Sequence, residues 1–292
     1  MGRTGVLIDI EQSDYQALSP DLIIDAIESQ GYLSDLRILA LNSYENRVYQ
    51  IGIKEQRPII AKFYRPQRWN DKQIIEEHQF TQQLFENEIP VIPCLRNAKD
   101  ESLFTYQGYR FALYPRKGGR APELGDPEHL YQLGRYLGRI HATGASKAYQ
   151  HRPSINTQTF LTDAYQFILD SDFLPSDLMP AYTSLMDDII EQVLMQYKLH
   201  DITQIRLHGD CHVGIILWTD TGPEFLDFDD SRMGPAVQDI WMLLSGSDIE
   251  QRQQLQELIE GYEEFYPFDK RESLLSFSSY KPTKICKTSR KN

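Results

Sequence analysis

The chain has 292 residues, with 30 Lys and Arg against 42 Asp and Glu, so its formal net charge is −12. At about 150 residues per domain, this length suits one large or two modest domains with a buried core. The acidic balance argues against nucleic acid and against an anionic membrane as partners, because both are bound through clusters of Lys and Arg. The sequence has no membrane-spanning apolar run, no secretory signal at its start and only three scattered cysteines, so we expect a cytoplasmic protein.

Residues 1–115 are expected to form a mostly antiparallel sheet with one or two helices. Ser19, Pro20 and Asp21 mark a helix start, as an N-cap, a proline at the first helical position and an acid at the positive end of the helix dipole. Asn70 is expected to cap a second helix, over 71–88. Strand-like segments lie at 36–41, 47–54, 57–64, 91–95, 102–107 and 109–114. Few polar residues separate the second and third segments, which predicts an antiparallel hairpin.

Composition changes at the Pro/Gly/basic stretch 115–120, and we expect a domain boundary between residues 115 and 116. Residues 116–272 are expected to be mainly helical. Helices are predicted from Asp126 onward and at 157–169, 178–198, 235–245 and 248–264, with short strands at 204–208, 214–218 and 224–228. Residues 273–292 carry five basic and no acidic side chains and lack a helical apolar period, so they are expected to form a disordered basic tail.

Two carboxylates on successive short segments form the densest chemical pattern in the chain. Asp210 lies in the run His208-Gly209-Asp210-Cys211-His212, and Asp227 follows after one short strand. A hairpin with its turn at 219–222 would bring the two together. Phosphoryl transfer needs this pair, one Asp to accept the proton of the nucleophile and one to hold Mg²⁺ on the phosphates. Either Asp alone would more often be a turn cap or part of a solvated loop, but apolar neighbours bury the strand that holds Asp227.

A second interpretation uses His208, Cys211 and His212 as ligands of a transition metal. Imidazole and thiolate are ligands that suit zinc. The chain offers no second Cys/His pair at a useful spacing, which disfavours this interpretation. In the simpler alternative, His208 positions the backbone of the loop and Cys211 is a small buried side chain.

One lysine, Lys62, lies inside the apolar strand 59–63, where an ammonium group is costly unless it meets an acid or a phosphate. The helix over 71–88 offers such an acid, Glu76 or Glu77. A lysine on a strand that pairs with a glutamate on the next helix forms the nucleotide-phosphate clamp of kinase folds. Before this lysine the turn lacks a glycine-rich loop, although Ser43 and nearby backbone amides could cover phosphates.

These residues together resemble the aminoglycoside-phosphotransferase/choline-kinase-like branch of the kinase superfamily, and within it a group of bacterial stress-response Ser/Thr protein kinases. The resemblance covers about residues 20–268, through LNSYENRVYQ, AKFYRPQRW, EEHQF, GRYLGRIH, RLHGDCH, FLDFDDSRMGPAVQDIWMLLSG and GYEEF. It implies an α+β, bilobed protein-kinase-like fold, with an antiparallel β N-lobe over 1–115 and a mainly helical C-lobe over 116–272. It also implies ATP and Mg²⁺ as cofactors and phosphorylation of protein Ser/Thr hydroxyls. We expect a monomer without a nucleic-acid or membrane partner.

The resemblance implies a role for each matching position of the second half. Asp210 would be the catalytic base, Asp227 the metal ligand and Asp239 a brace for the catalytic loop. One position departs from the pattern, because Ile215 stands where the family has an asparagine that holds metal. Isoleucine has no lone pair to donate, so reduced activity is expected. The chain also departs from its relatives after residue 268, where the resemblance would imply further helices.

In the first half, the resemblance implies a nucleotide site. Lys62 would contact the phosphates, with Glu77 or Glu76 as its partner, and Ser43 would lie in the phosphate loop. Tyr114, with the two residues after it, would form the hinge beside adenine. Two alternatives share these motifs: a catalytically inactive nucleotide-binding pseudokinase, and a kinase of small cationic molecules such as aminoglycosides or choline.

Overall fold

The computed structural model describes Tyr15, residues 17–199 and residues 202–272, and divides into two compact units. The first unit ends at Gly119 and the second begins at Arg120, in the loop that follows the predicted boundary at 115/116. The start of the chain and the predicted basic tail, 273–292, lie outside the described residues. Within the described part, no helix combines the length and the apolar character that a bilayer crossing requires.

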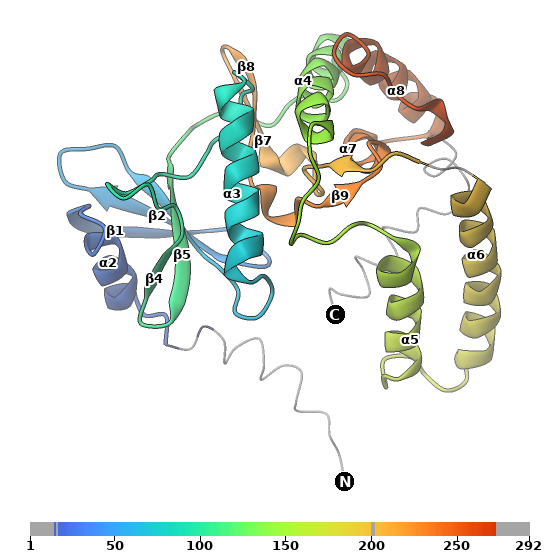
Figure 1. Cartoon of the computed structure of the whole chain (residues 1–292), viewed down its shortest axis with the longest axis horizontal. Coiled ribbons are helices and arrows are strands. Elements are labelled where there is room, and N and C mark those ends of the chain that lie inside the picture. Colours follow the sequence, from blue (N-terminus) through green and yellow to red (C-terminus); the bar gives the residue numbers. More distant parts are fainter. Residues whose placement is uncertain (1–14, 16, 200–201, 273–292) are drawn as a thin grey trace. The chain divides into compact units, whose positions relative to one another are not determined.

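The first unit is built on a five-stranded antiparallel sheet (Figure 1). Its strands are β1 (Ser34–Leu41), β2 (Arg47–Ile53), β3 (Ile59–Phe63), β4 (Phe104–Tyr106) and β5 (Tyr109–Pro115), in the order β1-β2-β3-β5-β4. Ile51 pairs with Ile59 across the predicted hairpin of β2 and β3. These strands confirm five of the six strand segments expected in this half.

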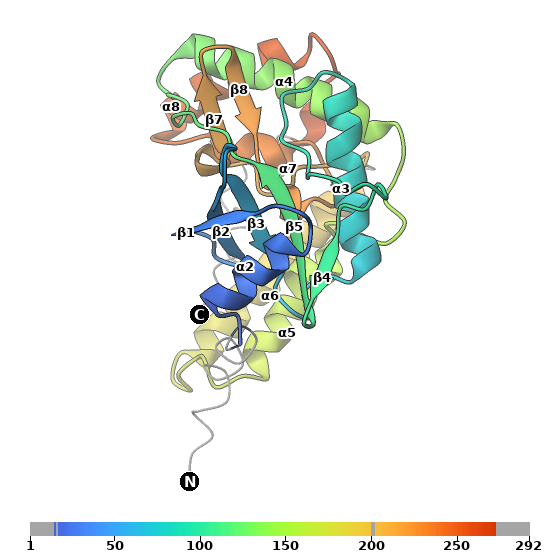
Figure 2. The ribbon, with the colours of Figure 1, turned by 90° about the vertical axis from the view of Figure 1, so that its left-hand side faces the viewer.

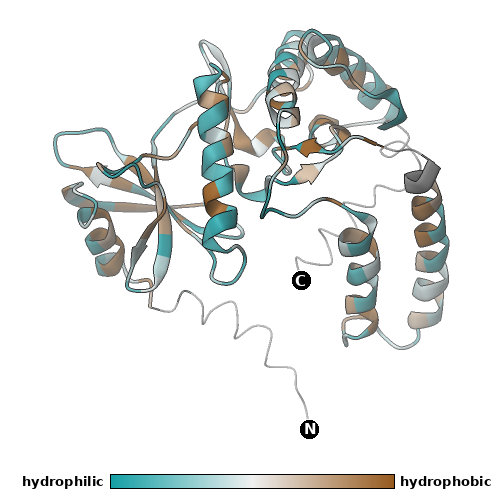
Figure 3. Cartoon of the chain, in the orientation of Figure 1, coloured by the Kyte–Doolittle hydropathy of each residue, from teal (hydrophilic) through white to brown (hydrophobic). Residues whose placement is uncertain are grey.

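Helices α2 (Pro20–Glu28) and α3 (Asp71–Glu86) cover opposite faces of this sheet (Figures 1 and 2). Both predicted N-caps are present, since Ser19 accepts the amide of Leu22 and Asn70 forms a capping box with Gln73. Alternate residues of the strands point to alternate faces. The isoleucines of α2 therefore pack against the odd-numbered residues of β3, and α3 packs against the face that carries Lys62. Figure 3 shows the strands as largely hydrophobic and α3 as largely hydrophilic.

The strand predicted over 91–95 is wrong, because this segment contains one isolated bridge residue, Val91, and is otherwise irregular. Pro90 and Pro93 lack the amide that a strand ladder needs, so regular pairing cannot continue through them. One hydrogen bond, from the Leu95 amide to the carbonyl of Leu113, ties the segment to β5. The apolar side chains of the segment are nevertheless buried, which explains its strand-like composition.

The core of the second unit joins α4 (Pro127–Ala145) to α8 (Asp248–Tyr262), which lie side by side (Figure 1). Three glycines permit this close approach. A methyl group on Gly134 would collide with the carbonyl oxygen of Leu258, and one on Gly261 would collide with that of Tyr131. A methyl group on Gly138 would also collide, with the carbonyl oxygen of Tyr262. The glycines of α4 and α8 therefore allow the two helix backbones to pack closely.

The rest of the second unit consists of a further long helix, α6, and several short elements. These are α5 (Asp163–Leu169), α6 (Met179–Leu199), β6 (Ile205–Arg206), β7 (Ile216–Thr219), β8 (Gly222–Phe225), β9 (Met233–Gly234) and α7 (Val237–Ile240). Strand β6 pairs with β9, and β7 pairs with β8 in a tight hairpin. Thr219 faces Gly222 at its turn, which confirms the hairpin predicted between Asp210 and Asp227.

Candidate active site

Lys62 lies in the middle of β3 with only 4% of its surface exposed. The strand register places it opposite Val48 on one side and Ala112 on the other. Its ammonium nitrogen lies 5.3 Å from the ring centroid of Tyr64, within the range of a cation–π contact. The strand therefore holds a buried cation on the face of the sheet that α3 covers.

Glu77 is the buried carboxylate of α3, with 2% of its surface exposed, whereas Glu76 is half-buried. The two candidates from the sequence thus differ clearly in burial. Glu77 and Lys62 both act electrostatically on the hydroxyl of Tyr64, which places them around one side chain. Burial, and then the charge of Glu77, hold the pKa of Tyr64 well above its usual range, so the phenol keeps its proton.

A chain of buried hydroxyl and imidazole groups continues from this point. The hydroxyl of Tyr64 lies 2.7 Å from Nε2 of His78 and 3.3 Å from the hydroxyl of Tyr114. The other ring nitrogen of His78 lies 2.9 Å from Oγ of Ser102. The hydroxyl of Tyr114 thus points toward the face that carries Lys62. The segment EEHQF contains His78 but assigns it no role, and no motif contains Ser102.

Ser43 lies in the turn between β1 and β2, as the sequence predicts, and its side chain is half-buried. The next segment is anchored by Asn46, whose carboxamide oxygen accepts the amide of Arg65 at 3.0 Å. Glu45 forms an ion pair with Arg65, with 3.0 Å between Oε2 and Nη1. The turn is therefore tied to the segment that follows β3.

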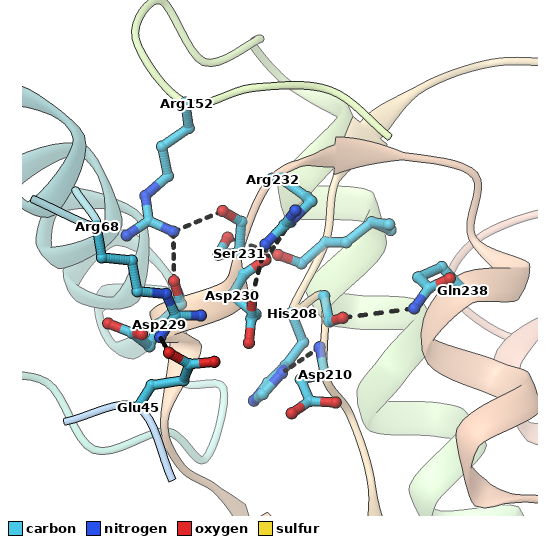
Figure 4. Close-up of polar contacts among 12 residues, drawn as sticks. Glu45, Arg68, Arg152, His208, Asp210, Asp229, Asp230, Ser231, Arg232 and Gln238 are labelled. Carbon is cyan, nitrogen blue, oxygen red and sulfur yellow. Dashed lines mark hydrogen bonds and ion pairs between the residues drawn. The ribbon is translucent and has the colours of Figure 1, made fainter. Parts of the chain in front are cut away.

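The loop of Asp210 is fixed by the imidazole of His208, which is fully buried (Figure 4). Nε2 of His208 lies 2.6 Å from the carbonyl oxygen of Leu226, and Nδ1 accepts the amide of Asp210 at 3.3 Å. Because a carbonyl only accepts, the proton of the neutral ring is on Nε2. The side chain of Asp210 remains partly exposed, at 31%. His208 thus connects the loop of Asp210 to the residue directly before Asp227.

Asp239, which lies on α7, holds the same loop through hydrogen bonds to its backbone. Its carboxylate accepts the amides of His208 and Gly209, both at 2.8 Å, which confirms the predicted brace. Oδ2 also lies 3.0 Å from Nε2 of His141, and both side chains are fully buried. Although burial would raise the pKa of Asp239, the hydrogen bond with His141 and those of the loop amides hold it below its usual value. The brace is therefore an ionised carboxylate.

The segment of Asp227 packs directly against the loop of Asp210. Gly209 has a φ of +88°, and a methyl group on it would collide with the carbonyl oxygen of Asp230. The rings of His208 and Phe228 lie 4.3 Å apart. Asp227 itself has a left-handed backbone, with φ 56° and ψ 64°, and its side chain is exposed. Aspartate tolerates this left-handed conformation better than most non-glycine residues do.

Arg152 fixes the turn after Asp227. No motif or periodic pattern in the sequence predicts this role. Its guanidinium nitrogen Nη1 donates to the carbonyl oxygens of Asp229, at 2.8 Å, and of Ser231, at 2.6 Å (Figure 4). Ser231 in turn donates its hydroxyl to the carbonyl oxygen of Leu207 at 2.6 Å. Arg152 comes from an irregular loop, so neither periodicity nor a motif distinguishes it from any other arginine.

Position 215 lies beside the metal-ligand candidate. The carbonyl oxygen of Ile215 accepts the amide of Leu226 at 3.0 Å, and Leu226 directly precedes Asp227. A short 3₁₀ turn, Val213–Ile215, carries the residue. The side chain at 215 is half-buried and purely hydrocarbon, so it offers no ligand to a cation.

The carboxylate of Asp227 is a ligand type that suits Mg²⁺, whereas the side chain of Ile215 offers no ligand. Mg²⁺ prefers oxygen ligands and is usually bound by one or two carboxylates together with phosphates and water, which Asp227 with the nearby Asp210 could provide. A zinc site fails this test. Both ring nitrogens of His208 are engaged by the backbone, and burial raises the pKa of Cys211 well above its usual value, which disfavours a thiolate. Among the described residues, no group of three or more His, Cys, Asp or Glu is arranged to hold a metal.

The fold is that of the protein-kinase-like phosphotransferases. The profile of the phosphotransferase enzyme family matches residues 37–274 of the chain. Stress response kinase A of Escherichia coli (strain K12) is 46% identical over 259 residues, which are 88% of this chain and 78% of that protein. Serine/threonine protein kinase RdoA of Salmonella typhimurium is 43% identical over 258 residues, with the same coverage.

Solved structures show the same fold at low sequence identity. Amicoumacin kinase hAmiN, determined with AMP-PNP and Ca²⁺, superposes with a TM-score of 0.72 at 17% identity, over 98% of this chain and 95% of that one. A microcompartment-associated aminopropanol kinase superposes with a TM-score of 0.69 at 14% identity, over 91% and 94%. The chain belongs to the phosphotransferase enzyme family, and it is an ATP-dependent phosphotransferase with the expected α+β kinase-like fold.

Proposed function

We propose that this protein transfers the γ-phosphoryl group of ATP, bound with Mg²⁺, to Ser or Thr hydroxyls of proteins. The observation that supports it best is the loop of Asp210, which the ionised Asp239 holds by two backbone amides and which packs against the segment of Asp227. Such rigid placement of two carboxylates is what phosphoryl transfer requires, because catalysis there is mainly positioning and charge stabilisation.

In the second unit, Asp210 would orient the attacking hydroxyl and accept its proton. Asp227 would hold the metal ion, which supplies positive charge to the phosphates when bound. His208 keeps the two carboxylate segments in contact through the carbonyl oxygen of Leu226.

In the first unit, the proposed nucleotide site centres on Lys62. Its ammonium group would contact the phosphates, and Glu77 would orient it from α3. Ser43 would lie over the phosphates, at the turn between β1 and β2. Tyr114 would lie at the adenine, at the end of β5.

We prefer a protein substrate because the relatives at 43–46% identity carry the names stress response kinase A and serine/threonine protein kinase RdoA. The neighbours named for small substrates, such as amicoumacin kinase, share 17% identity or less, and that likeness concerns the fold alone. We further propose that the protein acts as a monomer in the cytoplasm.

Ile215 is expected to slow the reaction rather than to prevent nucleotide binding. Loss of one metal ligand would remove about 3 kcal/mol or more of transition-state stabilisation, which is about a hundredfold or more in rate. Ile215→Asn would return a carboxamide oxygen to this position. In contrast, a pseudokinase would bind ATP with a thermal shift and transfer nothing in either form.

The substrate class can be decided by radiolabel transfer from ATP with Mg²⁺, using both the natural chain and Ile215→Asn. One arm contains extracted cell protein, and the other contains choline and kanamycin. We expect label on protein, recovered as phosphoserine or phosphothreonine after acid hydrolysis. Label on the amines alone would contradict the protein-kinase proposal and favour the small-molecule alternative.

A further inference from the structure

Glu272 is a buried carboxyl group that the proposed reaction does not use. It lies in the short 3₁₀ turn Lys270–Glu272 with 3% of its surface exposed. Its Oε2 accepts the amide of Val237 at 2.8 Å, and the amide of Ala236 also donates to this carboxyl group. The contact joins positions 35 residues apart in the chain.

The two amides belong to the start of α7, which has no local cap. Ala236, the residue before α7, has no side chain that could accept an amide, so the first amides need an acceptor from elsewhere. Glu272 provides it. Because α7 is only four residues long, the position of its start also sets the position of Asp239 within it.

A second route connects Glu272 to the same brace through α8. The hydroxyl of Tyr262 lies 2.9 Å from Nδ1 of His141, whose Nε2 lies 3.0 Å from Asp239. Burial, and then the charge of Glu272, raise the pKa of Tyr262 above its usual range. Glu272 therefore acts electrostatically on Tyr262, whose hydroxyl reaches Asp239 through His141.

We propose that Glu272 is a positioning residue of the phosphoryl-transfer centre. Its carboxyl group holds the start of α7, α7 places Asp239, and Asp239 fixes the amides of His208 and Gly209 before Asp210. The proposal rests on the proposed function of this loop. It adds a contact near the end of the described chain to the machinery that the motifs identify.

Burial gives this contact a pH dependence near neutrality. It raises the pKa of Glu272 to about 7, from an ordinary value of 4.5. The neighbouring charged groups are Asp269, which raises the pKa, and Arg271, which lowers it, and these two pair with each other at 2.6 Å. Tyr262, at the end of α8, and Tyr266, in the turn after it, also feel this charge, and their pKa values are raised, first by burial and then by Glu272.

The sign of the effect follows from linkage. We call the arrangement in which Glu272 is buried against the start of α7 the closed arrangement. Because the pKa of Glu272 is raised in it, the protonated carboxyl group favours the closed arrangement. Ionisation favours any opening in which Glu272 reaches water and regains its ordinary pKa. With pKa values of 7 and 4.5, opening should become about tenfold easier between pH 6 and pH 8.

Hydrogen exchange of the full-length protein tests this without requiring kinase activity. Peptides covering 205–212 and 235–241 are followed at pH 6 and pH 8, with rates corrected for the intrinsic pH dependence of exchange. In the natural chain we expect about tenfold more opening at pH 8. Glu272→Gln keeps a side-chain oxygen that can accept the backbone amides but cannot ionise. In this variant we expect equal opening at pH 6 and pH 8. The matched control Glu260→Gln, on the exposed face of α8, should behave like the natural chain.

Glu272→Ala removes the acceptor and should raise opening of both peptides at either pH. If this variant does not fold in a urea titration, the comparison with Glu272→Gln still decides. The proposal is overturned if Glu272→Gln keeps the pH dependence of the natural chain, or if a folded Glu272→Ala protects residues 205–212 as well as the natural chain does. Failure of phosphoryl transfer with the expected exchange pattern would count against the proposed function and not against this contact.

Discussion

Asp239→Asn tests the brace under the loop of Asp210. The carboxylate accepts two amides at 2.8 Å, from His208 and Gly209, and it pairs with His141 at 3.0 Å. Hydrogen bonds to a buried charged group contribute about 1.5–3 kcal/mol each. An asparagine keeps one acceptor oxygen and turns an NH₂ group toward the other amide, which leaves a buried donor unsatisfied. We therefore expect a loss of about 3–4 kcal/mol in the free energy of unfolding.

Urea unfolding measures this loss, with Asp220→Asn on the exposed hairpin turn as the matched control. The pKa of Asp239 is lowered on folding, so its contribution is present above the unfolded value of 3.8 and is lost as pH falls through the lowered pKa. The difference between Asp239→Asn and the natural chain should therefore shrink in acid. A loss below about 1 kcal/mol at pH 7, indistinguishable from the control, would refute the brace.

Two further substitutions test contacts that shape each unit. Gly134→Ala should destabilise the protein by about 1–3 kcal/mol in urea unfolding, because its methyl group collides with the carbonyl oxygen of Leu258; Gly125→Ala, with open space around it, should change little. Equal stability of the two variants would contradict the close contact of α4 and α8. Tyr64→Phe should cost about 1–3 kcal/mol, because it removes the hydroxyl 2.7 Å from Nε2 of His78, and an unchanged midpoint would show that this hydrogen bond contributes nothing.

Much of the fold could be predicted because local signals agree with the tertiary structure. The N-caps Ser19 and Asn70 and the turn at 219–222 depend on side chains within a few residues of the element they define. The segment 91–95 shows the limit, because burial gave it the composition of a strand while its prolines prevent pairing. Apolar composition indicates that a segment is buried. Whether the segment pairs as a strand depends on its backbone amides, which prolines lack.

The candidate site could be predicted where a motif fixes the spacing of its residues. Asp210, Asp227 and Asp239 lie in one such set. In the structure, the carboxylate of Asp239 accepts two backbone amides of the loop that carries Asp210. Arg152 and Glu272 could not be predicted, because they act through backbone groups distant in the chain. A side chain that satisfies a distant carbonyl or amide leaves no periodic trace in the sequence.

The rate of phosphoryl transfer from ATP tests the central claim most directly, measured as autophosphorylation for three forms of the protein. Ile215→Asn should exceed the natural chain by about a hundredfold or more, because a metal ligand returns beside Asp227. Asp210→Asn added to Ile215→Asn should abolish that gain while a thermal shift with ATP persists. If Ile215→Asn gains nothing, or if the gain survives the loss of Asp210, the proposed roles of these residues are wrong.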